Sequence, residues 1–146
     1  MRYKQIEGFT GYYVSEAGFI YSTRTSSRDK NKVGPIHLLK PRLTKNGYER
    51  VYLRNDVTNK RKDYYIHHLV ANAFIPNPNN LKYINHIDCI RNNNNVNNLE
   101  WCNVKYNANY TLNNNHLIRD PITGKFIGNY NYIPVKKELY DMCTII

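Results

Sequence analysis

Four residues in the middle of the chain have the types and spacing needed to cut a phosphodiester bond. They are Asn85, His86, Asn98 and Asn107. Such a cut needs a base that deprotonates water, a group that fixes the tautomer of that base, and a divalent cation at the phosphate. A neutral imidazole can take the proton near pH 7. We therefore assign the role of base to His86.

The three amides can meet the other two needs. The carbonyl of Asn98 can accept the second ring N–H of His86 and so orient the imidazole. Asn85 and Asn107 offer hard oxygens to Mg²⁺, a cation that takes few protein ligands and keeps several waters. We expect one Mg²⁺ or Mn²⁺ ion per site and no small-molecule cofactor.

The residues around these four predict a strand, a loop, a second strand and a helix. Residues 83–87 and 99–102 have the strand pattern, and an Asn-rich loop separates them. Asn103 is a good N-cap for the helix, because its side-chain oxygen can accept an otherwise unpaired amide of the first turn. This ββα hairpin brings the ends of two strands close to the first helical turn.

Earlier in the chain, hydrophobic periodicity predicts two hairpins and a helix. Residues 11–22 form the first hairpin around a turn that ends at Gly18. Residues 48–66 form the second hairpin, because strand-like alternation stops at Asn55 and returns at residue 63. Apolar residues at helical spacing then predict a helix over residues 67–74.

The chain carries a positive charge that favours polyanions. Its 146 residues include 21 Lys and Arg against 11 Asp and Glu, which gives a formal charge of +10. Nucleic acid is therefore the expected partner, held through its phosphates. Many of the cations fall in residues 23–45, which lack an apolar pattern and are predicted to be a basic loop. The predicted DNA contacts are Arg24, Arg28, Lys30, Lys32, Lys40, Arg42, Lys45, Arg91 and Lys105.

The composition favours an intracellular, non-secreted protein. No apolar run approaches the ~18 residues of a membrane span, and the first residues lack a signal-peptide core. Three cysteines with no CxxC pair argue against a zinc ribbon or a disulfide framework. We expect the protein in the cytoplasm of a host cell. Its many Asn, Tyr, Ile and Lys residues suit the AT-rich genome of a phage or large DNA virus.

These motifs resemble the HNH endonucleases of the phage intron-encoded homing type. The resemblance rests on residues 66–71, 74–76, 85–88, 93–94, 98–101 and 107. A second resemblance, to the N-terminal DNA-binding module that accompanies such nucleases, rests on residues 6–9, 13–15, 18 and 21–22. The family implies metal-dependent nicking or cleavage of duplex DNA. It also implies the roles given above to His86, Asn98, Asn85 and Asn107.

The expected fold is α+β in three parts. Residues 1–60 are predicted to form a small β-rich DNA-binding module. Residues 61–110 are predicted to form the HNH nuclease domain with its ββα-metal motif, and residues 111–146 a C-terminal extension of unknown role. We expect His67 to pack or cap a helix, Trp101 to lie in the core and Asp88 to stabilise the hairpin loop.

Departures from the family pattern keep two alternatives open. Asn85 stands where some members have Asp, His68 where many have Arg, and Cys89 and Ile90 where Gly and Asn are common. A Cys in a left-handed turn costs about 1 kcal/mol or more. The first alternative is a DNA-binding protein that retains the HNH fold without cleavage. The second is an RNA-binding module, for which the 14 Tyr residues are weak support.

Overall fold

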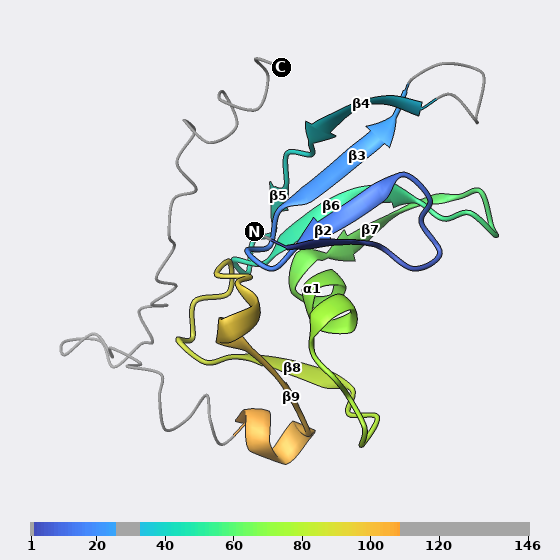
Figure 1. Ribbon diagram of the computed structural model, residues 1–146. Helices are drawn as coiled ribbons and strands as arrows, with labels where there is room; N and C mark the ends of the chain where they lie inside the picture. The colour runs from blue at the N-terminus through green and yellow to red at the C-terminus, as the bar shows by residue number, and fades with distance from the viewer. Residues whose placement is uncertain (1, 26–32, 109–146) are drawn as a thin grey trace, which may run out of the picture.

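The structure is a computed structural model that describes residues 2–25 and 33–108 (Figure 1). It combines three small antiparallel sheets with one helix of nine residues between them. Arg28, Lys30, Lys32 and the predicted extension over residues 111–146 lie outside the described residues.

The first sheet contains the first predicted hairpin. Its strands are β1 (Tyr3–Gln5), β2 (Tyr12–Ser15), β3 (Ile20–Arg24) and β4 (Val33–Leu38), in that order across the sheet. The turn from β2 to β3 places Gly18 at φ +86°, a conformation that glycine adopts without strain. The prediction of a hairpin over residues 11–22 is confirmed.

The second sheet contains the second predicted hairpin. It orders β5 (Arg42–Leu43), β6 (Glu49–Arg54) and β7 (Arg61–Tyr65). The prediction of a loop throughout residues 23–45 is wrong, because β4 and β5 lie in that range. Most side chains of β4 are exposed and the strand is held by its ladder to β3, so no apolar alternation marks it.

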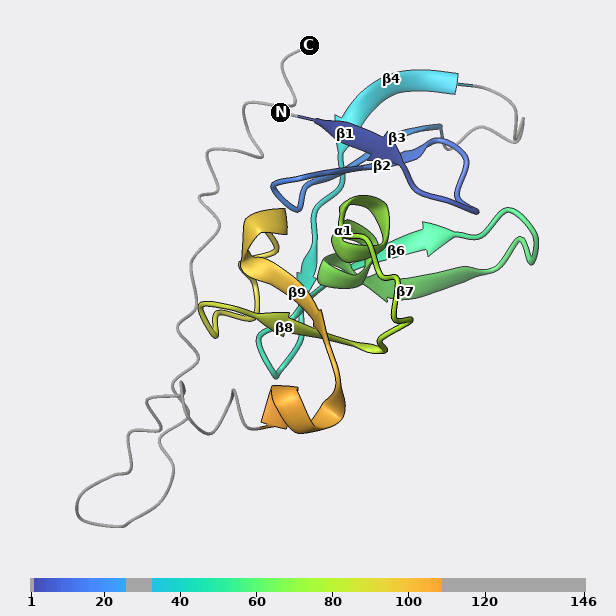
Figure 2. The ribbon, with the colours of Figure 1, turned by 60° about the horizontal axis from the view of Figure 1, so that its bottom comes forward.

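Helix α1 (Ile66–Phe74) follows the second sheet and lies at the centre of the molecule (Figure 2). Leu69 and Val70 of the helix pack in one core with Val14 and Leu53 from the two sheets. The predicted domain boundary at residue 60 falls in the turn of the β6–β7 hairpin. The core therefore draws on residues from both sides of that boundary.

The ββα hairpin closes the fold. Strands β8 (Tyr83–His86) and β9 (Leu99–Cys102) pair antiparallel, with a short 3-10 helix at Val96–Asn98 before β9. Trp101 Nε1 donates to the carbonyl of Ile75 at 3.1 Å, which fastens this ribbon to the end of α1. Both views place the ribbon on the side of α1 opposite the first sheet (Figures 1 and 2). Asn103 caps the following helix, since its Oδ1 accepts from Tyr106 N at 2.7 Å.

Candidate active site

His86 lies at the end of β8, with its imidazole turned into the molecule. It is 5% exposed, and its Nε2 is buried without a hydrogen-bond partner among the described residues. Burial lowers the pKa of His86 to about 4, so the ring is neutral at pH 7. A neutral imidazole can accept a proton.

Two aromatic neighbours enclose this imidazole. The ring of His67, from the first turn of α1, lies 5.1 Å from the ring of His86, and the ring of Tyr48 lies 6.0 Å from it. His67 is 6% exposed, and burial lowers its pKa to about 2. The expectation that His67 packs is confirmed, because its ring also contacts Tyr65 at 5.3 Å.

Asn85 precedes the histidine and bonds across the ribbon. It is 5% exposed, and its Nδ2 donates to Glu100 Oε1 at 2.7 Å, its register partner on β9. Because an amide has a donor end and an acceptor end, this bond leaves Asn85 Oδ1 as the atom that can ligate a cation. Glu100 adds the negative charge that two amides lack.

Asn98 fastens the loop that follows His86. Its Oδ1 accepts from Asp88 N at 2.9 Å, and its Nδ2 donates to Asp88 Oδ1 at 2.8 Å and to the carbonyl of Asn93 at 2.9 Å. No hydrogen bond joins its side chain to His86 in the part of the chain that the structure describes. The carboxylate of Asp88 also accepts from Ile90 N at 2.8 Å, which fits its predicted role in the loop.

Asn107 lies in the helix that follows β9, half-buried, with its N–H bonded to the carbonyl of Asn103 at 3.0 Å. Over residues 2–25 and 33–108, no group of three or more His, Cys, Asp or Glu side chains is placed to hold a metal ion. A cation here would take amide oxygens and waters as its main ligands. That donor set fits Mg²⁺ and does not fit zinc, which prefers Cys and His.

Sequence reasoning missed a pair of buried residues, Glu49 and Asn94, of which Asn94 interacts with His86. Glu49 is 8% exposed and Asn94 is 3% exposed, and Asn94 Nδ2 donates to Glu49 Oε2 at 2.8 Å. Burial raises the pKa of Glu49 to about 7. Alternation along β6 could have found Glu49, because it shares the buried face of the strand with Val51 and Leu53.

Comparisons with known proteins find similarity to HNH endonucleases. Residues 1–54 match the NUMOD4 motif. The uncharacterised HNH endonuclease L245 of Acanthamoeba polyphaga mimivirus is 34% identical over 128 residues, which is 88% of this chain and 35% of the viral protein. HNH endonuclease L247 of the same virus is 34% identical over 113 residues, 75% of this chain and 25% of that protein.

A solved structure agrees with these sequence matches. It describes DNA binding and cleavage by the HNH homing endonuclease I-HmuI. The match covers 77% of this chain and 59% of that chain, with a TM-score of 0.61 and 30% sequence identity. The chain is similar to the HNH homing endonucleases in sequence and in fold. Its α+β fold and its NUMOD4 motif are as predicted. The chain spans about a third of the length of L245 and a quarter of that of L247.

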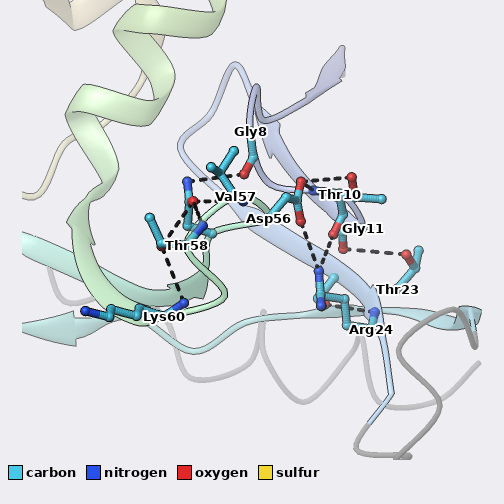
Figure 3. A network of polar contacts seen from close by, with 11 residues as sticks. Gly8, Thr10, Gly11, Thr23, Arg24, Asp56, Val57, Thr58 and Lys60 are labelled. Carbon is cyan, nitrogen blue, oxygen red and sulfur yellow. Dashed lines mark hydrogen bonds and ion pairs between the residues drawn. The ribbon is translucent and has the colours of Figure 1, made fainter.

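Arg24, a predicted DNA contact within the NUMOD4 motif, makes contacts within the protein. Arg24, at the end of β3, donates from Nη1 to the carbonyl of Thr10 at 2.9 Å and lies 3.5 Å from Asp56 Oδ1 (Figure 3). Its guanidinium also lies over the ring of Tyr12, 5.4 Å from the centroid. Arg24 thereby ties the first hairpin to the β6–β7 turn.

Other basic residues of this chain border an open groove along β5 and β6. The groove has a volume of about 550 Å³, and its lining includes Arg42, Lys45 and Arg50. Arg42 is ion-paired to Asp63, whereas Arg50 stacks on Tyr65 at 4.8 Å. Arg50 was not among the predicted contacts, because it lies in a strand and outside the basic loop.

Three more predicted contacts lie elsewhere on this HNH fold. Lys40 and Lys105 are exposed, whereas Arg91 is half-buried. Arg91 donates to the carbonyl of Asn46 at 3.0 Å and covers the ring of Tyr48 at 5.1 Å. Arg91 is therefore in contact with the aromatic wall of the His86 site. No helix within the described ranges is long and apolar enough to cross a membrane.

Proposed function

We propose that the chain is a divalent-metal-dependent endonuclease that nicks or cleaves duplex DNA. The observation that carries the proposal is the position of His86, a neutral imidazole at the end of β8 inside the ββα hairpin of an HNH fold. DNA binding and cleavage are described for I-HmuI, whose fold the chain shares.

His86 is the general base in this proposal. It takes a proton from a water, and that water attacks the scissile phosphorus while the bond to the leaving 3′ oxygen breaks. The neighbouring rings of His67 and Tyr48 exclude water from the buried side of the imidazole. Asn98 holds the following loop through Asp88, which fixes the end of β8 that carries His86.

The HNH endonucleases generally use a divalent metal, and we propose Mg²⁺ or Mn²⁺ here, one ion per site. Asn85 and Asn107 are the proposed ligands, with Glu100 holding the amide of Asn85 so that Oδ1 is free to ligate. When bound, the cation would supply positive charge for the phosphate and the leaving oxygen.

The DNA backbone would contact the basic side chains of the groove and of the exposed loops. Lys40, Lys45, Arg50 and Lys105 are the contacts that the described residues favour. The charge of +10 supports a partner held mainly through phosphates. Arg28, Lys30 and Lys32 remain predicted contacts on the sequence alone.

A plasmid nicking assay tests this function. Wild-type protein should convert supercoiled to nicked or linear DNA with Mg²⁺ or Mn²⁺ and fail to do so with EDTA. His86→Ala should lose at least about 100-fold in rate, within the range for loss of a general base, and keep its DNA affinity. His37→Ala is the matched control, because this exposed histidine lies on β4, away from the site.

The alternative function, DNA binding without cleavage, predicts a different outcome. Wild-type protein would then bind DNA and leave the plasmid supercoiled with every divalent metal. The departures at Asn85, Cys89 and Ile90 are the observations that favour this alternative. A His86→Ala variant as active as His37→Ala would remove His86 from the role of base.

A further inference from the structure

We propose that Glu49 and Asn94 are positioning residues for the His86 imidazole, so that the NUMOD4 motif supplies part of the nuclease site. The inference rests on the proposed function, in which His86 is the base. Glu49 belongs to β6 and to the matched motif over residues 1–54, whereas Asn94 lies in the Asn-rich loop before β9.

The bond between these two side chains fixes which way the Asn94 amide faces. Its Nδ2 has two acceptors, Glu49 Oε2 at 2.8 Å and the carbonyl of Asn92 at 3.4 Å. A rotation of the amide by 180° would turn its oxygen toward two other oxygens, which repel it. The carboxylate of Glu49 therefore sets the direction of Asn94 Oδ1.

In this proposal that oxygen accepts a hydrogen bond from the ring N–H of His86. Asn94 Oδ1 and His86 Nε2 are both buried, and neither has a partner among the described residues. The Asn94 side chain is close enough to the ring to raise the pKa of His86 against the larger effect of burial. A buried donor and a buried acceptor left unpaired cost free energy, so a small side-chain movement that joins them is favourable.

This pairing would fix the tautomer that a base needs. With the proton held on Nε2 by Asn94, Nδ1 carries the lone pair that accepts a proton from water. Asn98 was predicted to hold this proton, but its side-chain amide bonds to Asp88 and Asn93. Among the described residues, Asn94 Oδ1 is a buried amide acceptor without a partner.

The first sheet also holds the Asn-rich loop in place. Val96 N donates to the carbonyl of Glu16 at 2.8 Å. Gly18 approaches so closely that a Cβ on it would lie 2.7 Å from the Cβ of Asn94. Asn94 is therefore fixed from two elements of the matched motif, the β2–β3 turn and β6.

Kinetics of two Glu49 variants test the proposal. Glu49→Gln keeps an acceptor for Asn94, and Glu49→Leu removes it at similar volume. At saturating DNA, Glu49→Leu should lower the nicking rate about 10-fold, the low end for loss of an orienting partner, with unchanged DNA affinity. Glu49→Gln should stay within about 3-fold of wild type, since its amide oxygen can still accept from Asn94 Nδ2. Equal rates for the Leu and Gln variants would overturn the proposal.

A purely structural Glu49 would behave differently. Replacing Glu49 by Leu leaves Asn94 Nδ2 with only its longer bond to the carbonyl of Asn92, so Glu49→Leu should be less stable than wild type. The rates are therefore compared at a temperature at which every variant is fully folded, and a lower rate there reports positioning. In a His86→Ala background, Glu49→Leu should have no further effect on the residual rate. A further 10-fold loss in that background would show that Glu49 does not act through His86.

A measurement on the uncut protein separates this proposal from the function on which it rests. Ring nitrogen chemical shifts of His86 report its tautomer whether or not DNA is cleaved. Wild type and Glu49→Gln should show one dominant tautomer with the proton on Nε2, and Glu49→Leu and Asn94→Ala should show a mixture. If all four proteins give the same tautomer ratio, Glu49 and Asn94 do not position the ring, even where cleavage occurs.

Discussion

The backbone N–H of Cys89 donates to the carbonyl of His86 at 2.9 Å, and this closes a turn directly after the proposed base. Cys89 takes φ 59° in that turn. The left-handed region strains a residue with a Cβ and suits glycine. The chain therefore holds a strained residue three positions after His86.

Replacement of that cysteine by glycine should stabilise the protein. Cys89→Gly should raise the free energy of unfolding by about 1 kcal/mol, because it relieves the strain of φ 59°. Urea denaturation measures the change. Cys89→Ala is the control, since it removes the thiol and keeps the strained Cβ. A Gly variant no more stable than the Ala variant would mean that the turn carries no strain.

Gly18→Ala should disturb both stability and the site. The added Cβ would lie 2.7 Å from Asn94 Cβ and 3.1 Å from its carbonyl oxygen, at φ +86°. We expect a loss of about 2 kcal/mol or more in unfolding free energy and a lower nicking rate. Gly8→Ala is the matched control, because φ is +75° there and the added Cβ would come no closer than 3.8 Å to the Asn55 side chain. Equal losses of unfolding free energy in the two variants would mean that the strain of the positive φ accounts for the whole effect, with no contribution from the contact with Asn94.

The stability of the protein should respond to pH through the buried histidines His67 and His86, and through Glu49, whose effect has the opposite sign. Below pH 6.5 the unfolded chain protonates His67, whereas the folded protein keeps it neutral because its pKa is about 2. Stability from His67 is therefore lost as pH falls below 6.5, by up to ~1.4 kcal/mol per pH unit. The pKa of Glu49 is 4.5 in the unfolded chain and about 7 in the folded protein. Glu49 therefore lowers the stability of the folded protein as pH rises from 4.5 to about 7.

Two neutral variants separate these contributions between pH 4.5 and 6.5, the window in which they oppose each other. His67→Gln removes the gain in stability that His67 gives as pH rises. The slope of stability against pH should therefore be less positive than in wild type. Glu49→Gln should make stability rise more steeply with increasing pH. Thermal unfolding at several pH values gives both slopes. Slopes that match wild type in both variants would show that neither group is buried as described.

Asn85→Asp should make stability depend on metal. The new carboxylate would face Glu100 Oε1, now 2.7 Å from the Asn85 amide, and two like charges at that distance repel. We expect a lower melting temperature without metal and a larger rise with Mg²⁺ than wild type shows. Asn85→Ala is the control and should not gain from Mg²⁺. If Mg²⁺ shifts all three proteins equally, Asn85 is not a ligand.

Substitution of Arg24 should impair folding stability, whereas substitution of Lys45 should impair DNA binding. Arg24→Gln removes contacts to Thr10 and Asp56 (Figure 3) and should lower the unfolding free energy by about 1 kcal/mol. Lys45→Gln should leave stability within about 0.5 kcal/mol of wild type and lower the slope of log K against log salt by about 0.9. Salt titrations of DNA binding measure the slope. An unchanged slope in Lys45→Gln would show that Lys45 does not contact a DNA phosphate.

The sequence by itself determined the local elements and their order. The hairpins at residues 11–22 and 48–66, helix α1 and the β8–β9 ribbon each follow from a period of apolar residues and a turn or cap. Asn103 caps its helix through a bond to Tyr106, three residues away. Such features depend on neighbours in the chain, so a single sequence can reveal them.

Tertiary structure alone decided how the site is enclosed. Glu49 and Asn94 are 45 residues apart and meet only because the Asn-rich loop packs against β6 and the β2–β3 turn. Arg24 is 32 residues from Asp56, and only the folded chain brings the two side chains together. β4 is held by its ladder to β3 with little burial, so apolar pattern does not mark it. Each of these depends on a contact between distant segments, which residue type and local spacing do not encode.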